Sequence, residues 1–197
     1  MSNASTIRRQ VAGTQQLTLA SISVATAATE TAFALNNNAL TLSGGGLVPL
    51  VAGVTGLYQG TGQVLWIHAA GTLVGGTATG TLVLKLYEVP ASAIAAGIST
   101  TSPFSGTLIA TSATGTLAAG ETAGSFTVDA YIQLDAQGNL TGTYQSQVFG
   151  SATGAKTAIT LVSGLVGEAD LNFLLSATSA VETTGTITLD EFSLNFV

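Results

Sequence analysis

The sequence predicts an all-β fold, a two-sheet antiparallel sandwich of the jelly-roll type that follows an extended N-terminal arm. Three observations predict it. Apolar and polar residues alternate along many short runs, as they do in half-buried strands. Turns that contain Gly or Asn separate these runs at short intervals. The chain of 197 residues is hydrophobic at 46% of its positions, which is enough for a sizeable core between two sheets.

The chain divides into two parts. Residues 1–16 are polar and show no periodicity, so we expect an extended arm. Residues 17–197 carry the alternating runs without a charged or proline-rich linker, so we expect one β-sandwich domain. The runs in this domain predict strands at residues 17–24, 39–42, 48–54, 63–70, 80–89, 107–111, 125–134, 139–149, 171–177 and 184–197.

The run at residues 125–134 has the cleanest alternation. Its apolar positions, which we expect to face the core, are Phe126, Val128, Ala130, Ile132 and Leu134. The turn at residues 135–138 opens with Asp and ends with Gly, which predicts a hairpin with a left-handed glycine.

Two local signals interrupt the strand pattern. Residues 90–97 begin with Pro, are rich in Ala and end with Gly, which predicts one short helix. In the last strand the apolar phase changes at Asp190 and Glu191, which predicts a β-bulge.

The run at residues 63–70 contains the single Trp and the single His of the chain. Trp66 and His68 share one face of this strand. We expect Trp66 to be a large core aromatic, whose replacement by Ala would cost about 3–5 kcal/mol. We expect His68 to be a histidine of the core or of an interface.

Composition excludes several kinds of chemistry. The chain has no Cys, which excludes disulfides, zinc ribbons, iron–sulfur clusters and thiol nucleophiles. A Ser–His–Asp triad would have to use His68, and no Gly-x-Ser-x-Gly motif accompanies it. We expect no catalytic residues, no cofactor and no metal, and therefore no enzyme.

Acidic residues leave two other possibilities open. Glu168 and Asp170 share a face of an extended chain, where they would bind Ca²⁺ together with backbone carbonyls, but no calcium-loop motif accompanies them. A glycoside hydrolase would need two carboxyls in one cleft. The sequence does not place Asp129, Asp135 or Glu121 in such a cleft.

Charge and hydropathy bear on partners. The formal net charge is −6 and Lys and Arg number only 4, which excludes nucleic-acid binding through phosphate contacts. No run is long and apolar enough for a membrane-spanning helix, and we expect neither a signal peptide nor a membrane partner. Only 7% of residues are charged, against about 25% in an ordinary domain. So sparse a charged surface favours an oligomer or larger assembly over a monomer coated with hydroxyl groups.

Exposed aromatic residues suggest a small ligand. Tyr131 points outward by alternation, and Tyr144 lies in the partner strand of the same hairpin. Both are candidate contacts for a carbohydrate, although aromatic pairs more commonly pack across strands.

Six segments carry a resemblance to a known group of proteins. They read GTLVLKLYEV from residue 80, GTLIATS from residue 106, GSFTVDAYIQLD from residue 124, GNLTGTYQSQV from residue 138, DLNFLLSAT from residue 170 and TITLDEFSLNFV from residue 186. This pattern resembles the capsid decoration (cement) proteins of tailed bacteriophages and related jelly-roll proteins of the head or tail. The resemblance covers about residues 60–197, and residues 1–59 add nothing to it.

The resemblance implies a structural virion protein that assembles in the host cytoplasm and binds the major capsid protein of the assembled head, most simply as a trimer. In this role Arg8 and Arg9 of the arm would pair with acidic groups of the shell, or the arm would exchange between identical subunits. The alternative role is a tail or baseplate module that binds host carbohydrate through Tyr131 and Tyr144.

Overall fold

The computed structural model describes most of the domain that the sequence predicts. The described residues are 21–23, 29–36, 47–58, 62–99, 101–149, 156–158, 168–180 and 185–197. The N-terminal arm, with Arg8 and Arg9, and the strand expected at residues 39–42 lie outside this set.

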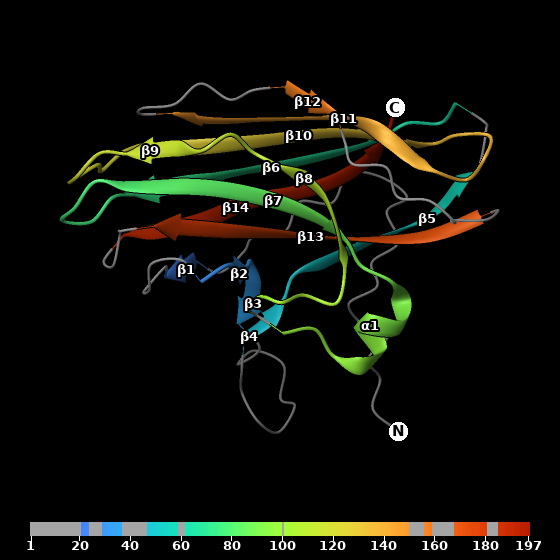
Figure 1. The fold of residues 1–197 in the computed structure, drawn as a ribbon, viewed down its shortest axis with the longest axis horizontal. Helices are drawn as coiled ribbons and strands as arrows, with labels where there is room; N and C mark the ends of the chain where they lie inside the picture. Colours follow the sequence, from blue (N-terminus) through green and yellow to red (C-terminus); the bar gives the residue numbers. More distant parts are fainter. Residues whose placement is uncertain are drawn as a thin grey trace.

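The first sheet, here called sheet A, has six strands in the order β1-β14-β6-β10-β11-β12. All neighbouring pairs are antiparallel, and the long strands run along the longest axis of the molecule (Figure 1). The strands are β1 (Ser21–Ser23), β6 (Leu65–Val74), β10 (Gly124–Leu134), β11 (Leu140–Phe149), β12 (Lys156–Ala158) and β14 (Thr186–Phe196).

The second sheet, sheet B, is built around β13, which pairs with β7. Two strands, β2 and β5, pair with the other edge of β13, and β8 and β9 pair with the other edge of β7. The strands are β2 (Thr31–Ala32), β5 (Val51–Tyr58), β7 (Gly80–Glu88), β8 (Thr107–Thr111), β9 (Gly115–Leu117) and β13 (Glu168–Ala180), and a separate pair is formed by β3 (Ala34–Asn36) and β4 (Leu47–Pro49).

The strand order is that of a jelly roll, as the sequence predicts. Sheet A contains the order β1-β14-β6-β10, and sheet B contains β2-β13-β7-β8. The chain changes sheet at several connections, such as those between β6 and β7, between β9 and β10, and between β13 and β14. The first described strand, β1, pairs with the last, β14. The hairpin of β10 and β11, followed by β12, widens sheet A beyond the four strands of the basic arrangement.

The core lies between the two sheets and follows the predicted alternation. Every second residue of β10 is buried, from Phe126 to Leu134. Opposite it, Leu82, Leu84 and Leu86 of β7 and Phe173 of β13 are buried in the same apolar cluster. This burial of apolar side chains from both sheets is the main source of the fold's stability.

The outer faces of the two sheets differ. The short helix α1 (Ala91–Ala96) lies beside β13 and helps to cover the outer face of sheet B (Figure 1). A second apolar cluster joins Ala93 of this helix to Tyr87 of β7 and Leu174 of β13. The helix begins after Pro90 and ends at Gly97, whose φ of 92° favours glycine, which confirms the predicted helix.

The bulge predicted in the last strand is present in β14. The register with β6 shifts between Leu189 and Glu191, so that Leu189 and Phe192 are both buried. Gly71 of β6 lies opposite this bulge. A Cβ at Gly71 would lie 2.0 Å from the carbonyl oxygen of Thr188 and 2.5 Å from the ring of Phe126. Glycine is therefore needed here for close packing.

The predicted hairpin turn after β10 is also confirmed. Gly138 has a φ of 76°. Asp135 Oδ1 accepts hydrogen bonds from the backbone N–H groups of Gln137 and Asn139, at 2.9 and 2.8 Å. The bonds from Asn139 and the rest of the turn hold the pKa of the Asp135 carboxyl below its usual value. Asp135 thus stabilises a turn, as Asx residues commonly do.

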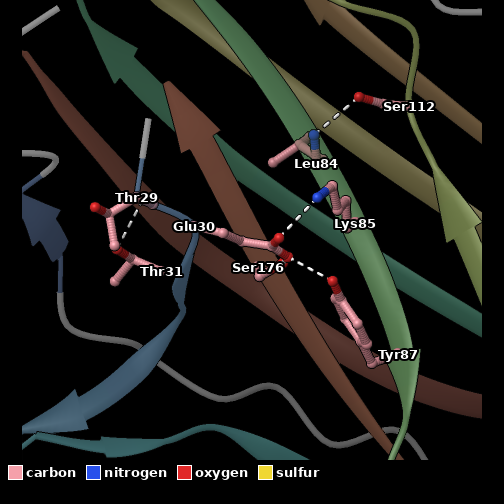
Figure 2. A network of polar contacts seen from close by, with 8 residues as sticks. All are labelled: Thr29, Glu30, Thr31, Leu84, Lys85, Tyr87, Ser112 and Ser176. Atoms are coloured by element: carbon pink, nitrogen blue, oxygen red, sulfur yellow. Dashed lines mark hydrogen bonds and ion pairs between the residues drawn. The ribbon is translucent and has the colours of Figure 1, made fainter. Parts of the chain in front are cut away.

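A buried polar network fastens the segment before β2 to sheet B. Figure 2 shows Glu30 reaching across β13 to β7. Its carboxylate accepts hydrogen bonds from Lys85 Nζ at 2.7 Å, Tyr87 Oη at 2.8 Å and Ser176 Oγ at 2.5 Å. Burial alone would raise the pKa of Glu30, but the bonds to Lys85, Ser176 and Tyr87 outweigh it, so the pKa lies below its usual value. Burial and the bond to Glu30 raise the pKa of Tyr87.

Candidate functional site

The candidate site lies on the outer face of sheet A, where β6 and β10 run side by side. Trp66 is directly opposite Tyr131 in the strand register, and His68 is directly opposite Asp129. In each strand these residues alternate with buried ones, so all four side chains point away from the core. We call these four residues the outer-face cluster.

Asp129 connects the two ring systems of β6. The indole Nε1 of Trp66 donates a hydrogen bond to Asp129 Oδ1 at 2.8 Å. The same oxygen lies 2.9 Å from His68 Nδ1. Because a carboxylate only accepts hydrogen bonds, Nδ1 of His68 is the donor of this bond. Both bonds end on Oδ1, and neither uses Oδ2.

The aromatic rings of the cluster pack against one another. The rings of Trp66 and Tyr131 are nearly parallel, with an interplanar angle of 10° and centroids 6.4 Å apart. The His68 ring is 5.5 Å from Trp66 and tilted by 46°. Tyr131 is 44% exposed, which makes it one of the most exposed large apolar residues that the structure describes. The cluster therefore combines aromatic surface with a fixed carboxylate.

Neutral polar residues flank the cluster. Asn195 of β14 is opposite Trp66, and Thr143 of β11 is opposite Tyr131. Gln145 of β11 is opposite Asp129 and exposed. Apart from Asp129 and His68, the outward positions of β6, β10 and β11 carry no charged side chain. The arrangement suits the binding of a neutral partner by stacking and hydrogen bonding.

The structure corrects the expected place of Trp66. It does not lie in the core but on the outer face, half-buried beside Tyr131. The core face of β6 is formed by Leu65, Ile67 and Ala69 instead. The sequence indicates this arrangement, because the face of β6 that carries Trp66 also carries the polar residues His68 and Thr72, whereas the opposite face is apolar throughout. His68 is 21% exposed and is likewise not a core residue.

The structure also separates the two tyrosines proposed as carbohydrate contacts. Tyr131 faces outward as expected, but Tyr144 is completely buried in the main core. Its Oη donates a hydrogen bond to the carbonyl oxygen of Leu84 at 3.4 Å, and burial raises its pKa. Tyr144 shares its face of β11 with Leu140 and Val148, so the two tyrosines lie on opposite faces of sheet A. The expectation for Tyr144 was wrong.

Three of the acidic residues considered for catalysis or metal binding have described side chains, and these three do not meet as a group. Asp129 lies in the outer-face cluster, and Asp135 lies six residues on, about 20 Å along an extended strand. Glu121 accepts a hydrogen bond from the backbone N–H of Ala123 in a different loop. Asp170 falls at a register shift in β13, between Ala169 and Leu171, and the side chains of Glu168 and Asp170 lie outside the described set. Within the described ranges, no group of three or more His, Asp or Glu residues has the arrangement of a metal site.

Comparisons with known proteins add no assignment. No family model, no curated protein and no solved structure matches this chain. In the part of the chain that the structure describes, no helix has the length and apolarity to cross a membrane. Function must therefore be argued from the jelly-roll fold and from the outer face of sheet A.

Proposed function

We propose that this protein is a structural virion subunit, a capsid decoration protein that binds the assembled head of a tailed bacteriophage and stabilises it. The partner is the major capsid protein, and the subunit acts as a homo-oligomer, most simply a trimer. The role is non-catalytic, and the protein is located in the virion after assembly in the host cytoplasm.

One observation carries this proposal, the broad outer face of sheet A, on which ionisable side chains are few: Asp129, His68 and Glu191 of β14, which is opposite Ala70. Thr, Ser, Gln and Asn occupy most of the outward positions of its long strands, with Thr72, Gln133 and Gln147 among the exposed ones. Removing a charged group from water costs several kcal/mol, whereas neutral hydroxyl and amide groups exchange water for new partners at little cost. The cores of protein interfaces are accordingly poor in charge.

The stabilising mechanism is mass action. A subunit that binds the assembled shell more tightly than the separate shell protein shifts the equilibrium toward the closed shell. A trimer would hold the shell at several places at once, so that release becomes slow even when each contact is weak.

The N-terminal arm supplies a second contact in this proposal. It carries Arg8 and Arg9, half of the basic residues of the chain. In a chain of net charge −6, these residues are the obvious partners for acidic groups of the shell. Exchange of the arm between identical subunits is the competing role. Deletion of residues 2–16 separates the two, because it abolishes shell binding in the first case and only oligomer formation in the second.

Co-sedimentation with empty phage shells tests the proposal. We expect the full chain to pellet with shells and Thr72→Asp, which places a charge within the neutral face, to bind at least about tenfold more weakly. The matched control is Thr111→Asp, an exposed threonine of β8 in sheet B, which should bind like the wild type. If the full chain stays in the supernatant at saturating shell concentration, the decoration role is wrong.

A second candidate function has one specific observation in its favour. A tail or baseplate module that binds host carbohydrate would need an exposed aromatic surface beside hydrogen-bonding groups. The outer-face cluster, with its parallel Trp66 and Tyr131 rings and the Asp129 carboxylate, has this composition.

A further inference from the structure

We infer that the outer-face cluster is a binding site for the pyranose ring of a neutral sugar, in which the ring lies against Trp66 and Tyr131 and Asp129 orients its hydroxyl groups. This inference deepens the carbohydrate-binding candidate and rests on it. It does not depend on binding to a phage shell, so each can fail without the other.

The aromatic pair provides the apolar contact. One face of a pyranose ring presents mainly C–H groups, which stack favourably on an aromatic surface while the hydroxyl groups point sideways into water. Tyr131 remains 44% exposed beside the nearly parallel ring of Trp66. Aromatic surface is therefore left over for a ligand.

The polar contacts hold the site in one conformation before any ligand binds. The Trp66 ring is fixed by its hydrogen bond to Asp129 Oδ1, and His68 is fixed by the same oxygen. A ligand then loses little free energy in ordering these side chains. Asp129 is 33% exposed, and its Oδ2, which neither ring uses, accepts a hydrogen bond from a sugar hydroxyl.

The surrounding residues decide the class of sugar. Asn195 and Thr143, which flank the rings in the strand register, offer an amide and a hydroxyl group to the outer hydroxyls of a sugar. The Asp129 carboxylate and the net charge of −6 repel an anionic sugar such as a uronic or sialic acid. The site therefore favours neutral hexoses and their N-acetylated forms.

The single tryptophan makes the site directly observable. Because Trp66 is the only Trp in the chain, all tryptophan fluorescence of the protein reports on this cluster. We would titrate the full chain separately with cellohexaose, mannohexaose, chitohexaose and maltohexaose. We expect at least one to produce a saturable change in fluorescence. Sorbitol, which has hydroxyl groups but no ring face, and an oligogalacturonate, which is anionic, should produce none.

Variants then locate the binding, measured by calorimetry with the sugar that responds. Tyr131→Ala should weaken binding about tenfold or more, whereas Tyr131→Phe, which keeps the ring, should restore it. Asp129→Ala should weaken binding to a similar degree. Gln147→Ala, an exposed residue of β11 on the same face, is the matched control and should bind like the wild type. Thermal unfolding of each variant shows that the fold is retained.

The outcomes separate this inference from shell binding. Saturable binding of a neutral sugar that Tyr131→Ala weakens supports the inference, whatever the shell assay shows. No response to any of the four sugars overturns it, and so does a response that Tyr131→Ala leaves unchanged. If no sugar binds but Tyr131→Ala abolishes co-sedimentation with shells, the cluster is a contact for the shell protein. The sugar site is then wrong, while the decoration role stands.

Discussion

At the scale of single residues, Glu30 links parts of the chain that are far apart in sequence. Its carboxylate bonds to Lys85, Tyr87 and Ser176, which lie 55, 57 and 146 residues away. A buried carboxylate is costly unless every such bond is made, so the network favours one arrangement of the segment before β2. No local pattern in the sequence reveals these partners, because they meet only where β7 and β13 pair in the folded sheet B.

Glu30→Gln should destabilise the protein by about 2 kcal/mol at neutral pH, because the charged hydrogen bond and ion pair with Lys85 are lost. The pKa of Glu30 is lower in the folded state than its unfolded value of about 4.3. Its contribution is therefore complete above that value and is lost as the pH falls through the folded pKa.

Urea unfolding of the wild type and Glu30→Gln at a series of pH values measures this effect. The difference between them should be full at pH values above about 4.3 and shrink steadily below it. Asp190→Asn, the same change at an exposed carboxylate of β14, is the control. A difference that stays constant down to strongly acidic pH would contradict the role of the Glu30 charge.

Trp66 gives a second prediction at this scale. Because it lies half-buried on the outer face, Trp66→Ala should cost about 1–2 kcal/mol, mainly from its hydrogen bond to Asp129 and its ring contacts. Phe126→Ala, which removes a fully buried ring, should cost about 3–5 kcal/mol. Chemical unfolding of both variants checks the order. If Trp66→Ala lowers the free energy of unfolding as much as Phe126→Ala or more, Trp66 is a core residue and its place on the outer face is wrong.

At the scale of secondary-structure elements, strong alternation was sufficient to predict strands and their faces. The core positions of β10 and the bulge in β14 followed from the phase of the apolar residues alone. Helix α1 followed from Pro90 and Gly97. The two- and three-residue strands β2, β3, β9 and β12 did not, because so short a run has no measurable period. Their pairing is set by neighbouring strands.

The face of an element is harder to predict when both faces carry apolar residues. In β6 we predicted that Trp66 faces the core because its side chain is large and apolar. This prediction was wrong, and the polar residue His68 on the same face indicated the outer face. In β11 the buried position of Tyr144 follows from Leu140 and Val148 on the same face. The outward position of Tyr131 was thus predicted correctly. The polar residues on the face of Trp66 were the signal that was missed in β6, and the cross-strand register then shows that Trp66 lies opposite Tyr131.

The bulge region of β14 gives a prediction at the element scale. Gly71→Ala should destabilise the protein by about 3 kcal/mol, because the added methyl group meets the backbone of Thr188 and the ring of Phe126. Gly97→Ala is the control, since a Cβ there meets nothing within 4 Å and only the positive φ is strained. Its cost should be about 1–2 kcal/mol. Thermal and urea unfolding measure both, and equal losses would show that Gly71 is not sterically required.

At the scale of the whole molecule, the two sheets differ in how their outer faces are used. Sheet B is covered by α1 and fastened by the Glu30 network, so its outer face belongs to the fold. The described part of sheet A presents a broad outer face with few ionisable side chains, and the outer-face cluster lies on it at β6 and β10. Both proposed functions place the partner on this face.

The most direct test of the decoration role is the temperature at which assembled phage shells open, measured by calorimetry with and without saturating amounts of the protein. We expect the protein to raise this temperature in proportion to its occupancy of the shell, because it binds the closed shell preferentially. Thr72→Asp at the same concentration should raise the temperature less. An opening temperature that does not change at full occupancy would show that the protein binds without stabilising the shell, and the central claim would be wrong.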